Sequence, residues 1–326
     1  MLIEVIEVIL RRAIRSGAAR QAEGGSMKEA QPVKSFWTTV RQWARPPATV
    51  LAPAPPSPPK IGLALGGGFA RGIAHAGLLK VFEQHRIPIH CITGVSAGAI
   101  VAAAYASGVA PADIGQAGCA MRMGDVGRWS LGRMGFIANE RMKKFLERLL
   151  KCYRFEEMHI PLGVIATDLV KGEPVYFCGA GDVVLPIRAS CAYPGLFHPI
   201  HYQERLLVDG AMSIEIPARL ARQLGATHVI SVYLPNSGGP LPSNMFQVVN
   251  RCFQILHSRN EDIWRRESDL VIVPDVGGVA WDGFGCGPDL LRAGEEAAQA
   301  AVDSIQAWLP RAKPASAGLI QGSVPA

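Results

Sequence analysis

Two short apolar segments that each run straight into a glycine-rich turn constrain the fold of this chain most. Residues 61–65 (Ile-Gly-Leu-Ala-Leu) precede three consecutive glycines, and residues 89–93 precede the sequence Gly-Val-Ser-Ala-Gly. A helical pattern follows each turn, at 72–85 and at 99–106. Strand, turn and helix repeated in this order predict parallel strands joined by crossover helices, which is the α/β class.

The rest of the chain continues this alternation. Further strands are predicted at 162–166, 174–178, 206–208, 228–233 and 270–273, and further helices at 139–151, 216–224, 245–268 and 290–308. The segment 121–136 is interpreted as a connecting loop, with a mobile flap as the alternative.

Composition divides the chain into three parts. Residues 1–59 form an N-terminal extension whose last part, 46–59, is rich in proline and predicts a stiff, extended linker. Within the extension, 34–45 carries Trp and basic residues, so it is either an interfacial amphipathic anchor or an unstructured extension. The folded domain is expected at 60–309, and the tail at 310–326 is expected to be disordered.

Charge and cysteine content exclude several classes of protein. The formal net charge is +6 with arginines spread along the chain, which favours contact with an anionic lipid surface over nucleic-acid binding. Seven cysteines without a CxxC pair predict neither a zinc site nor a redox site. No signal peptide is recognisable, so a cytoplasmic location is expected, with or without peripheral contact at the membrane. The sequence does not predict the oligomeric state.

The second glycine turn fits the pattern G-x-S-x-G with Ser96 at its centre. A serine on so tight a turn needs small residues two positions away on either side, because a Cβ there would collide with the adjoining strand or helix. Gly94 and Gly98 meet this need. The turn also sets the hydroxyl at a helix N-terminus, where free N–H groups stabilise negative charge. We interpret Ser96 as a nucleophile in preference to a residue of a structural turn.

The first glycine turn consists of Gly66, Gly67, Gly68, Phe69, Ala70, Arg71 and Gly72. It fails the dinucleotide-binding fingerprint, because a residue other than glycine occupies a required position whichever glycine starts the motif. It also lacks the lysine followed by serine or threonine that ends a P-loop. A nest of backbone N–H groups that holds an oxyanion remains the favoured interpretation, with a tight turn that binds no ligand as the alternative.

A serine nucleophile needs a base, and none of the eight histidines is clearly placed for this role. His228 lies inside an apolar strand and His257 within a helical pattern, so both are interpreted as structural. His198 and His201 are interpreted as strand or pocket-wall residues. Asp209, on an Asp-Gly turn that closes a predicted strand, is the other candidate base.

Together these blocks resemble the patatin-like phospholipase family, bacterial relatives of patatin and of the catalytic domain of neuropathy target esterase. The likeness runs from about residue 60 to about residue 308. It rests on the glycine loop ending in Arg71-Gly72, on 73–79, on 94–99 and on Asp209-Gly210-Ala211, with further blocks at 166–173 and 188–197. Three motifs in the correct order are more specific than any one of them.

The resemblance implies a three-layer α/β/α fold with a central, mostly parallel sheet. It implies a serine lipid acyl hydrolase of the phospholipase A or lysophospholipase type, with Ser96 as nucleophile and Asp209 as proton acceptor of a dyad. The amides of Gly67, Gly68 and Phe69 would form the oxyanion hole. Supporting roles would fall to Gly66, Arg71, Gly72, Gly94, Gly98, Gly210 and Ala211. The implied substrate is a phospholipid or lysophospholipid, with no metal and no organic cofactor.

Two departures from the family pattern concern the site itself. Phe69 stands where many relatives carry a further glycine, so its backbone must reach a comparable conformation without glycine's freedom. Residues 213–215 (Ser-Ile-Glu) replace an Asn-bearing stretch that often follows the Asp-Gly turn.

Three other functions remain open. A Ser–His acyltransferase or thioesterase acting on carrier-bound acyl groups would need a histidine within hydrogen-bond reach of Ser96. A nucleotide-binding module would use the glycine loop. A non-catalytic lipid-binding protein would leave the serine idle.

Overall fold

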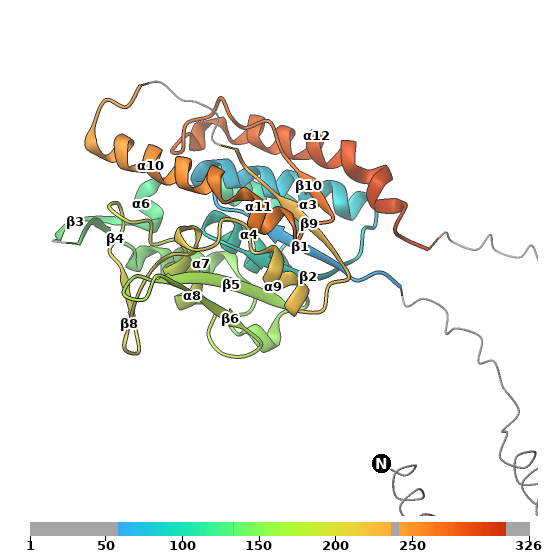
Figure 1. The fold of residues 1–326 in the computed structure, drawn as a ribbon, viewed down its shortest axis with the longest axis horizontal. Helices are drawn as coiled ribbons and strands as arrows, with labels where there is room; N and C mark the ends of the chain where they lie inside the picture. The colour runs from blue at the N-terminus through green and yellow to red at the C-terminus, as the bar shows by residue number, and fades with distance from the viewer. Residues whose placement is uncertain (1–57, 133, 236–240, 311–326) are drawn as a thin grey trace, which may run out of the picture. The chain divides into compact units, whose positions relative to one another are not determined.

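The computed structural model describes residues 58–132, 134–235 and 241–310 (Figure 1). They belong to the second of two compact units of the chain, Ser57–Ala326. The amphipathic segment at 34–45, nearly all of the expected linker and all but the first residue of the expected tail lie outside the described residues. The expectations for those segments therefore stay predictions.

The described residues build one large sheet of eight strands. Its path runs in the order β10 (Leu270–Ile272), β9 (His228–Val232), β1 (Ile61–Leu65), β2 (Ile89–Gly94), β5 (Leu162–Asp168), β8 (Arg205–Asp209) and β7 (Ile200–Tyr202), and β6 (Glu173–Cys178) pairs with β5. The strands from β10 to β5 are parallel, whereas β6, β7 and β8 pair antiparallel. The expected mostly parallel sheet is confirmed.

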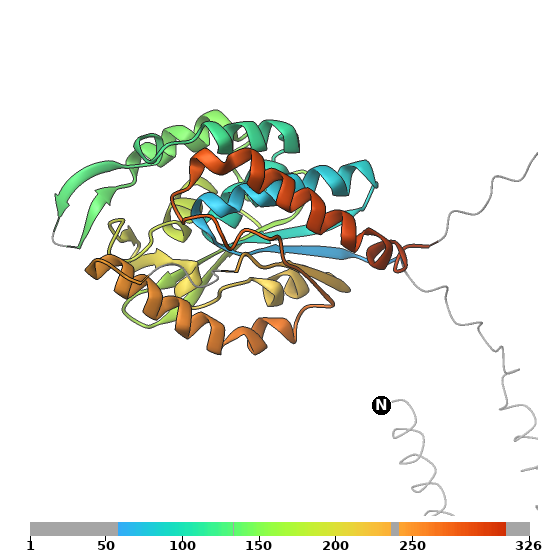
Figure 2. The same ribbon diagram turned by 90° about the horizontal axis from the view of Figure 1, so that it is seen from above.

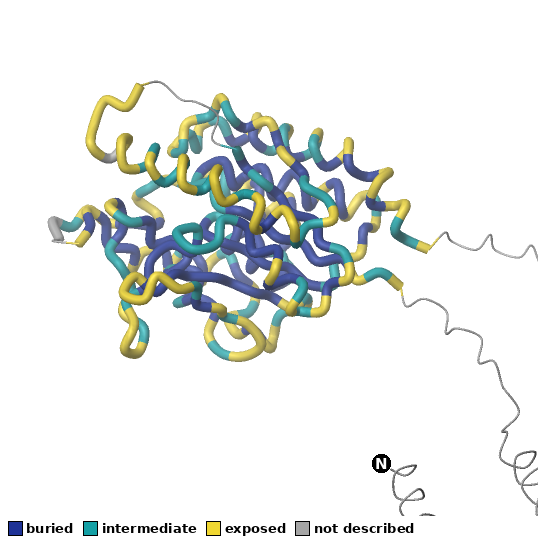
Figure 3. The backbone as a smooth tube through the Cα atoms, in the orientation of Figure 1, coloured by how far each residue is buried: buried dark blue, intermediate teal, exposed yellow. Residues whose placement is uncertain are grey.

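Helices cover both faces of this sheet, as the two ribbon views show (Figures 1 and 2). On one face, Ile61, Leu63 and Leu65 of β1 belong to the largest hydrophobic core. The helices that pack into this core include α3 (Ala74–Gln84), α4 (Ala97–Ala106), α5 (Pro111–Ala120) and α12 (Gly287–Gln306). Ala64, between Leu63 and Leu65, points to the other face, toward α9 (Ala218–Gln223) and α11 (Glu261–Arg265). Burial follows the same layers (Figure 3). This is the expected three-layer α/β/α arrangement.

Several elements differ from those predicted. The first helix begins as a 3-10 turn, η1 (Phe69–Ile73), before α3, and the helix expected at 245–268 is divided at Asn260 into α10 (Met245–Arg259) and α11. The segment interpreted as a connecting loop instead contains α6 (Met123–Val126) and a hairpin of β3 (Arg128–Gly132) and β4 (Gly135–Ala138). The sequence prediction also missed α5 and α8 (Val184–Ser190), whereas His201, interpreted as a strand or pocket-wall residue, lies in β7.

Two further elements are α7 (Glu140–Leu149), at a position where a helix was predicted, and η3 (Gly210–Met212), which directly follows Asp209. Within the described ranges, none of the helices is both long enough and apolar enough to cross a bilayer.

Candidate active site

Ser96 occupies the sharp turn between β2 and α4. Its backbone has φ 55° and ψ −125°, a left-handed conformation that a residue with a side chain adopts only under constraint. The constraint comes from close backbone packing on both sides of the serine. A Cβ on Gly94 would meet the carbonyl oxygen of Gly98, and a Cβ on Gly98 would meet that of Leu65. The need for small residues at these two positions is confirmed.

The turn is held by a contact that the sequence did not reveal. The backbone N–H of Ser96 donates to the hydroxyl of Ser190, at 2.8 Å, and both residues are buried. Ser190 is the last residue of α8 and falls in the block 188–197 that resembles the family, but no feature of the sequence showed its role.

The glycine loop lies directly against the nucleophile. A Cβ on Gly67 would stand 3.2 Å from the Cβ of Ser96, so only glycine allows the loop to come this close. The N–H groups of Gly67, Gly68 and Phe69 donate no backbone hydrogen bond to any residue that the structure describes. They are therefore available as donors to an oxygen atom next to Ser96.

Two side chains, those of His75 after the loop and of Arg71 within it, fix the position of the glycine loop. The Nε2 of His75 lies 2.9 Å from the carbonyl oxygen of Gly66, and because a carbonyl only accepts, this nitrogen carries the proton. Complete burial lowers the pKa of His75 to about 4, so the ring is neutral near pH 7. The guanidinium of Arg71 donates to the carbonyl oxygen of Pro235 at 2.9 Å. A Cβ on Gly72 would stand 2.6 Å from that of Ala97, which explains the glycine there.

Phe69 reaches the left-handed conformation without being glycine. Its φ is 53°, and its ring packs edge-on against Tyr193 and Trp281, with centroids 5.1 and 5.0 Å away. Such aromatic pairs stabilise by about 1 kcal/mol each, which is comparable to the cost of the backbone conformation. Phe69 thus adopts a left-handed backbone conformation, as expected from the sequence, and the packing of its ring offsets the cost.

Asp209 ends β8 and is completely buried. Its Oδ1 accepts a hydrogen bond from the N–H of Ala211 at 2.9 Å, while its Oδ2 has no hydrogen-bond partner among the described residues. Burial raises the pKa of Asp209 to about 7, and the Ala211 N–H and the Ser96 hydroxyl act in the opposite direction. Ser96 therefore lies beside the carboxylate, although no formed hydrogen bond satisfies Oδ2.

The Asp-Gly turn is anchored from β5. The hydroxyl of Thr167 donates to the carbonyl oxygen of Asp209 at 2.9 Å and lies 2.8 Å from the hydroxyl of Ser213. A Cβ on Gly210 would collide with the carbonyl oxygen of Ile165. Ser213, one of the residues that depart from the family pattern, thus takes part in supporting the turn.

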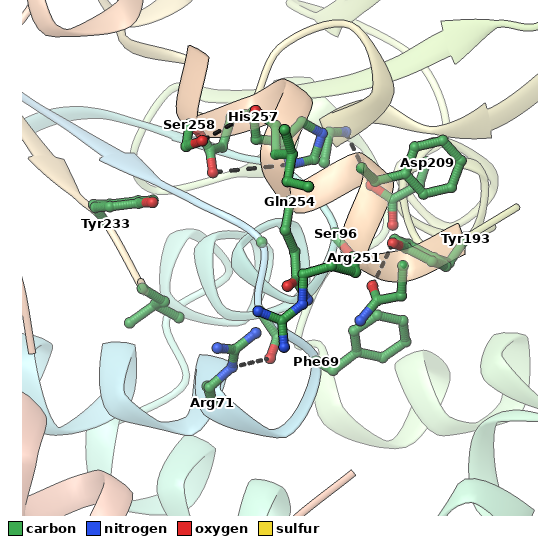
Figure 4. Close-up of a pocket in the computed structure, with 18 residues that line it drawn as sticks. Phe69, Arg71, Ser96, Tyr193, Asp209, Tyr233, Arg251, Gln254, His257 and Ser258 are labelled. Atoms are coloured by element: carbon green, nitrogen blue, oxygen red, sulfur yellow. Dashed lines mark hydrogen bonds and ion pairs between the residues drawn. The ribbon is translucent and has the colours of Figure 1, made fainter. Parts of the chain in front are cut away.

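These residues surround one pocket of about 230 Å³ (Figure 4). Of the predicted site residues, it is lined by Gly67, Gly68, Phe69, Arg71, Ser96, Asp209 and Ala211. The remaining ones, which shape the turns without lining the pocket, are Gly66, Gly72, Gly94, Gly98 and Gly210. One whole wall comes from α10, through Asn250, Arg251, Phe253, Gln254, Ile255, His257 and Ser258.

His257 is the main surprise of this wall, because the sequence argument interpreted it as structural. It lines the pocket, and its Nδ1 lies 3.9 Å from Oε1 of Glu215. Burial lowers the pKa of His257 and raises the pKa of Glu215 to about 7. No histidine side chain is hydrogen-bonded to Ser96 within the described part of the chain. His228 lies elsewhere, with its ring 4.8 Å from that of Trp308.

The described residues contain no group of three or more His, Cys, Asp or Glu side chains that could hold a metal ion.

Comparison with known proteins finds relatives for the same part of the chain. The family model "Patatin-like phospholipase" matches residues 63–222. An uncharacterised NTE family protein of Mycobacterium tuberculosis is 30% identical over 200 residues, covering 56% of this chain and 52% of the relative. Lysophospholipase nte1 of Emericella nidulans is 28% identical over 204 residues, which cover 59% of this chain but 13% of that much longer protein. The matched part of this chain thus spans about half of the length of the first relative and much less of the second.

A solved structure agrees in fold. The crystal structure of VipD from Legionella pneumophila superposes with a TM-score of 0.52 at 14% identity, covering 76% of this chain and 67% of that chain. This similarity covers more of the chain than the segment that the family model matches. Residues 63–222 therefore form a domain that matches the patatin-like phospholipase family, and NTE family proteins are similar to the same part of the chain.

Proposed function

We propose that this chain is a lipid acyl hydrolase that cleaves fatty-acyl ester bonds through a dyad of Ser96 and Asp209. The observation that carries the proposal is a fully buried carboxylate whose pKa is raised to about 7, beside a serine on a strained turn. The open N–H groups of the glycine loop line the same pocket and supply the third element that ester hydrolysis requires.

The first half of the reaction forms an acyl-enzyme. The Oγ of Ser96 attacks the ester carbonyl carbon while its proton passes to Oδ2 of Asp209, the carboxylate oxygen without a partner in the described structure. The negative charge that develops on the carbonyl oxygen is bound by the amides of Gly67, Gly68 and Phe69. When the tetrahedral intermediate collapses, the C–O bond to the alcohol breaks, and the leaving oxygen takes the proton from Asp209.

The second half releases the fatty acid. A water molecule gives its proton to Asp209 and attacks the acyl carbon, and the same amides bind the second oxyanion. Collapse then breaks the bond to Ser96, whose oxygen recovers the proton from Asp209. Every step thus uses a single carboxylate, alternately as base and as acid, and the atoms and protons balance.

The raised pKa gives the carboxylate its strength as a base. An ordinary aspartate, near 3.8, accepts a proton poorly at neutral pH, whereas a carboxylate with a pKa near 7 is roughly a thousandfold more basic. The buried strand residues Leu207 and Val208 keep water from this carboxylate.

The proposed substrates are phospholipids or lysophospholipids met at a membrane surface. Phe69, Phe253 and Leu234 give the pocket an apolar wall for an acyl chain, and the guanidinium of Arg71 adds positive charge. A relative is named a lysophospholipase, which agrees with this substrate class.

Release of fatty acid from phospholipid vesicles by wild type, Ser96→Ala and Asp209→Asn proteins, in the presence of a chelator, tests the proposal. Wild type should release fatty acid, and both variants should fall by at least about a hundredfold. An Asp209→Asn protein with full turnover would overturn the dyad. Silence of wild type on vesicles, combined with labelling of Ser96 by a fluorophosphonate, would keep the nucleophile and reject the substrate class.

A further inference from the structure

Helix α10 turns its apolar side away from the protein. Its apolar residues recur three or four positions apart, which places them in one stripe along the helix. This apolar stripe consists of Met245, Val248, Val249, Cys252, Ile255 and Leu256. All six side chains are exposed, from 40% at Val249 to 77% at Met245 for the five large apolar residues. Figure 3 shows the exposed colour along α10.

The polar side of the same helix faces the catalytic pocket. Asn250, Gln254 and His257 line the pocket beside Ser96 (Figure 4). The Oδ1 of Asn250 accepts a hydrogen bond from the hydroxyl of Tyr193 at 2.7 Å. A surface helix of a globular protein normally buries its apolar stripe and exposes its polar face. In α10, Phe253 packs inward and Ile255 lies at the rim of the pocket, but the other residues of the apolar stripe are exposed and do not line the pocket, so an apolar phase outside this unit would complete their packing.

We propose that the apolar stripe of α10 docks on the surface of an anionic lipid bilayer and brings the mouth of the Ser96 pocket to that surface. The proposal rests on the proposed function for the reason why a lipid is met there, but docking itself requires no turnover. An amphipathic helix with basic residues and an exposed apolar face lies in the plane of a lipid interface.

The charge of the helix selects the kind of surface. Between residues 241 and 260 the chain has Arg251 and Arg259 but no aspartate or glutamate. Basic residues next to a lipid-binding face favour anionic headgroups, and this attraction falls with salt. Leu241 and Ile263, exposed by 91% and 70%, extend the apolar surface beyond both ends of α10.

The position of the helix links docking to substrate entry. The same helix supplies a wall of the pocket and the apolar stripe. The two ribbon views place α10 at the edge of the unit (Figures 1 and 2). A lipid that leaves the bilayer beside the apolar stripe therefore has only the width of a helix, about 10 Å, between it and the pocket that Ser96 lines.

Cosedimentation with vesicles tests the docking, with the full chain carrying Ser96→Ala so that hydrolysis does not alter the lipid. Vesicles of phosphatidylcholine with phosphatidylglycerol are compared with phosphatidylcholine alone. The pair Val248→Glu and Leu256→Glu adds charge to the apolar stripe at positions that do not line the pocket, and glutamate favours the helix. The pair Ala300→Glu and Gln306→Glu on α12, both exposed, makes the same change in charge as a matched control.

We expect the stripe pair to weaken partitioning onto anionic vesicles at least tenfold and the control pair by less than twofold, with unchanged circular dichroism in both. The Ser96→Ala protein should bind anionic vesicles more tightly than neutral vesicles, and this preference should fall as salt is raised. Equal binding by the stripe pair and its parent would overturn the proposal, and so would equal losses in the two pairs. Because turnover is not measured, these outcomes do not depend on the proposed catalytic activity.

Two other occupants of the apolar stripe give different results. If a second copy of the chain covers the stripe, light scattering shows a dimer that the stripe pair dissociates, and the proposal fails. If the segment at 34–45 covers it, the stripe pair leaves vesicle binding unchanged, and the proposal fails as well. With Ser96 restored, the stripe pair should hydrolyse a short, water-soluble ester at the wild-type rate. A loss of this turnover as large as the loss of vesicle binding would show that the stripe has a structural role, and the proposal would fail.

Discussion

The pH dependence of turnover follows from the burial of Asp209. The carboxylate must be ionised to accept the proton of Ser96, and burial raises its pKa to about 7, so the group is protonated and inactive below neutrality. At pH 5, two pH units lower, about one carboxylate in a hundred is ionised, which predicts a rate about a hundredfold below the plateau. An aspartate with the ordinary pKa of 3.8 would be more than about nine-tenths ionised at pH 5 and would show almost no loss.

The assay is the initial rate of hydrolysis of a soluble, uncharged ester between pH 4.5 and 9, expressed as kcat/KM. A neutral substrate keeps its own ionisation out of the profile, and circular dichroism at each pH shows that the protein stays folded. The predicted profile rises tenfold per pH unit and levels off near pH 7. A profile that is flat from pH 5 to pH 9 would refute the reasoning, because it would mean that the base is not a carboxylate with a raised pKa.

Three further substitutions follow from the same geometry. Asp209→Asn should stabilise the fold at pH 8 by up to about 4 kcal/mol and leave it nearly unchanged at pH 4. A carboxylate whose pKa is raised by folding lowers the free energy of unfolding as the pH rises from its pKa in the unfolded protein to its pKa in the folded protein. Thermal unfolding at the two pH values checks this, and an equal effect at both would contradict it. Gly67→Ala should lower kcat by about 100-fold, since its Cβ would stand 3.2 Å from that of Ser96 and displace an amide of the loop; unchanged single-turnover rates would argue against an oxyanion role. Ser190→Ala should cost about 1 to 3 kcal/mol of unfolding free energy, because the buried N–H of Ser96 loses its acceptor; denaturant unfolding measures it, and an undiminished free energy would show that another group takes over the N–H.

The parallel core of the fold was readable from the sequence because its signals are local. A short apolar run that ends in glycine marks a buried strand followed by a turn, and this pattern identified β1 and β2; short apolar runs alone identified β5 and β9. The elements that were missed lack such a signal. The strands β3 and β4 have five and four residues and α8 has seven, so each is too short to show a clear period in the sequence.

The candidate site was also only partly predictable from the sequence. The sequence identified Ser96, Asp209 and the glycine loop because their turns need residue types that are unusual elsewhere. Ser190 and His257 reach the site from helices whose local sequence is ordinary. The polar side of α10 could be interpreted only once the structure showed that it faces the pocket, since an amphipathic pattern does not show which side faces the protein.

The most direct test of the account is the rate at which a fluorophosphonate labels Ser96 in three proteins: wild type, Asp209→Asn and His257→Ala. Labelling depends on activation of the serine alone and not on the identity of the lipid. The account predicts that at pH 8 Asp209→Asn reacts at least about a hundredfold more slowly than wild type, while His257→Ala stays within about threefold. The reverse result, a silent His257→Ala and a fully reactive Asp209→Asn, would contradict the dyad and identify a Ser–His enzyme instead.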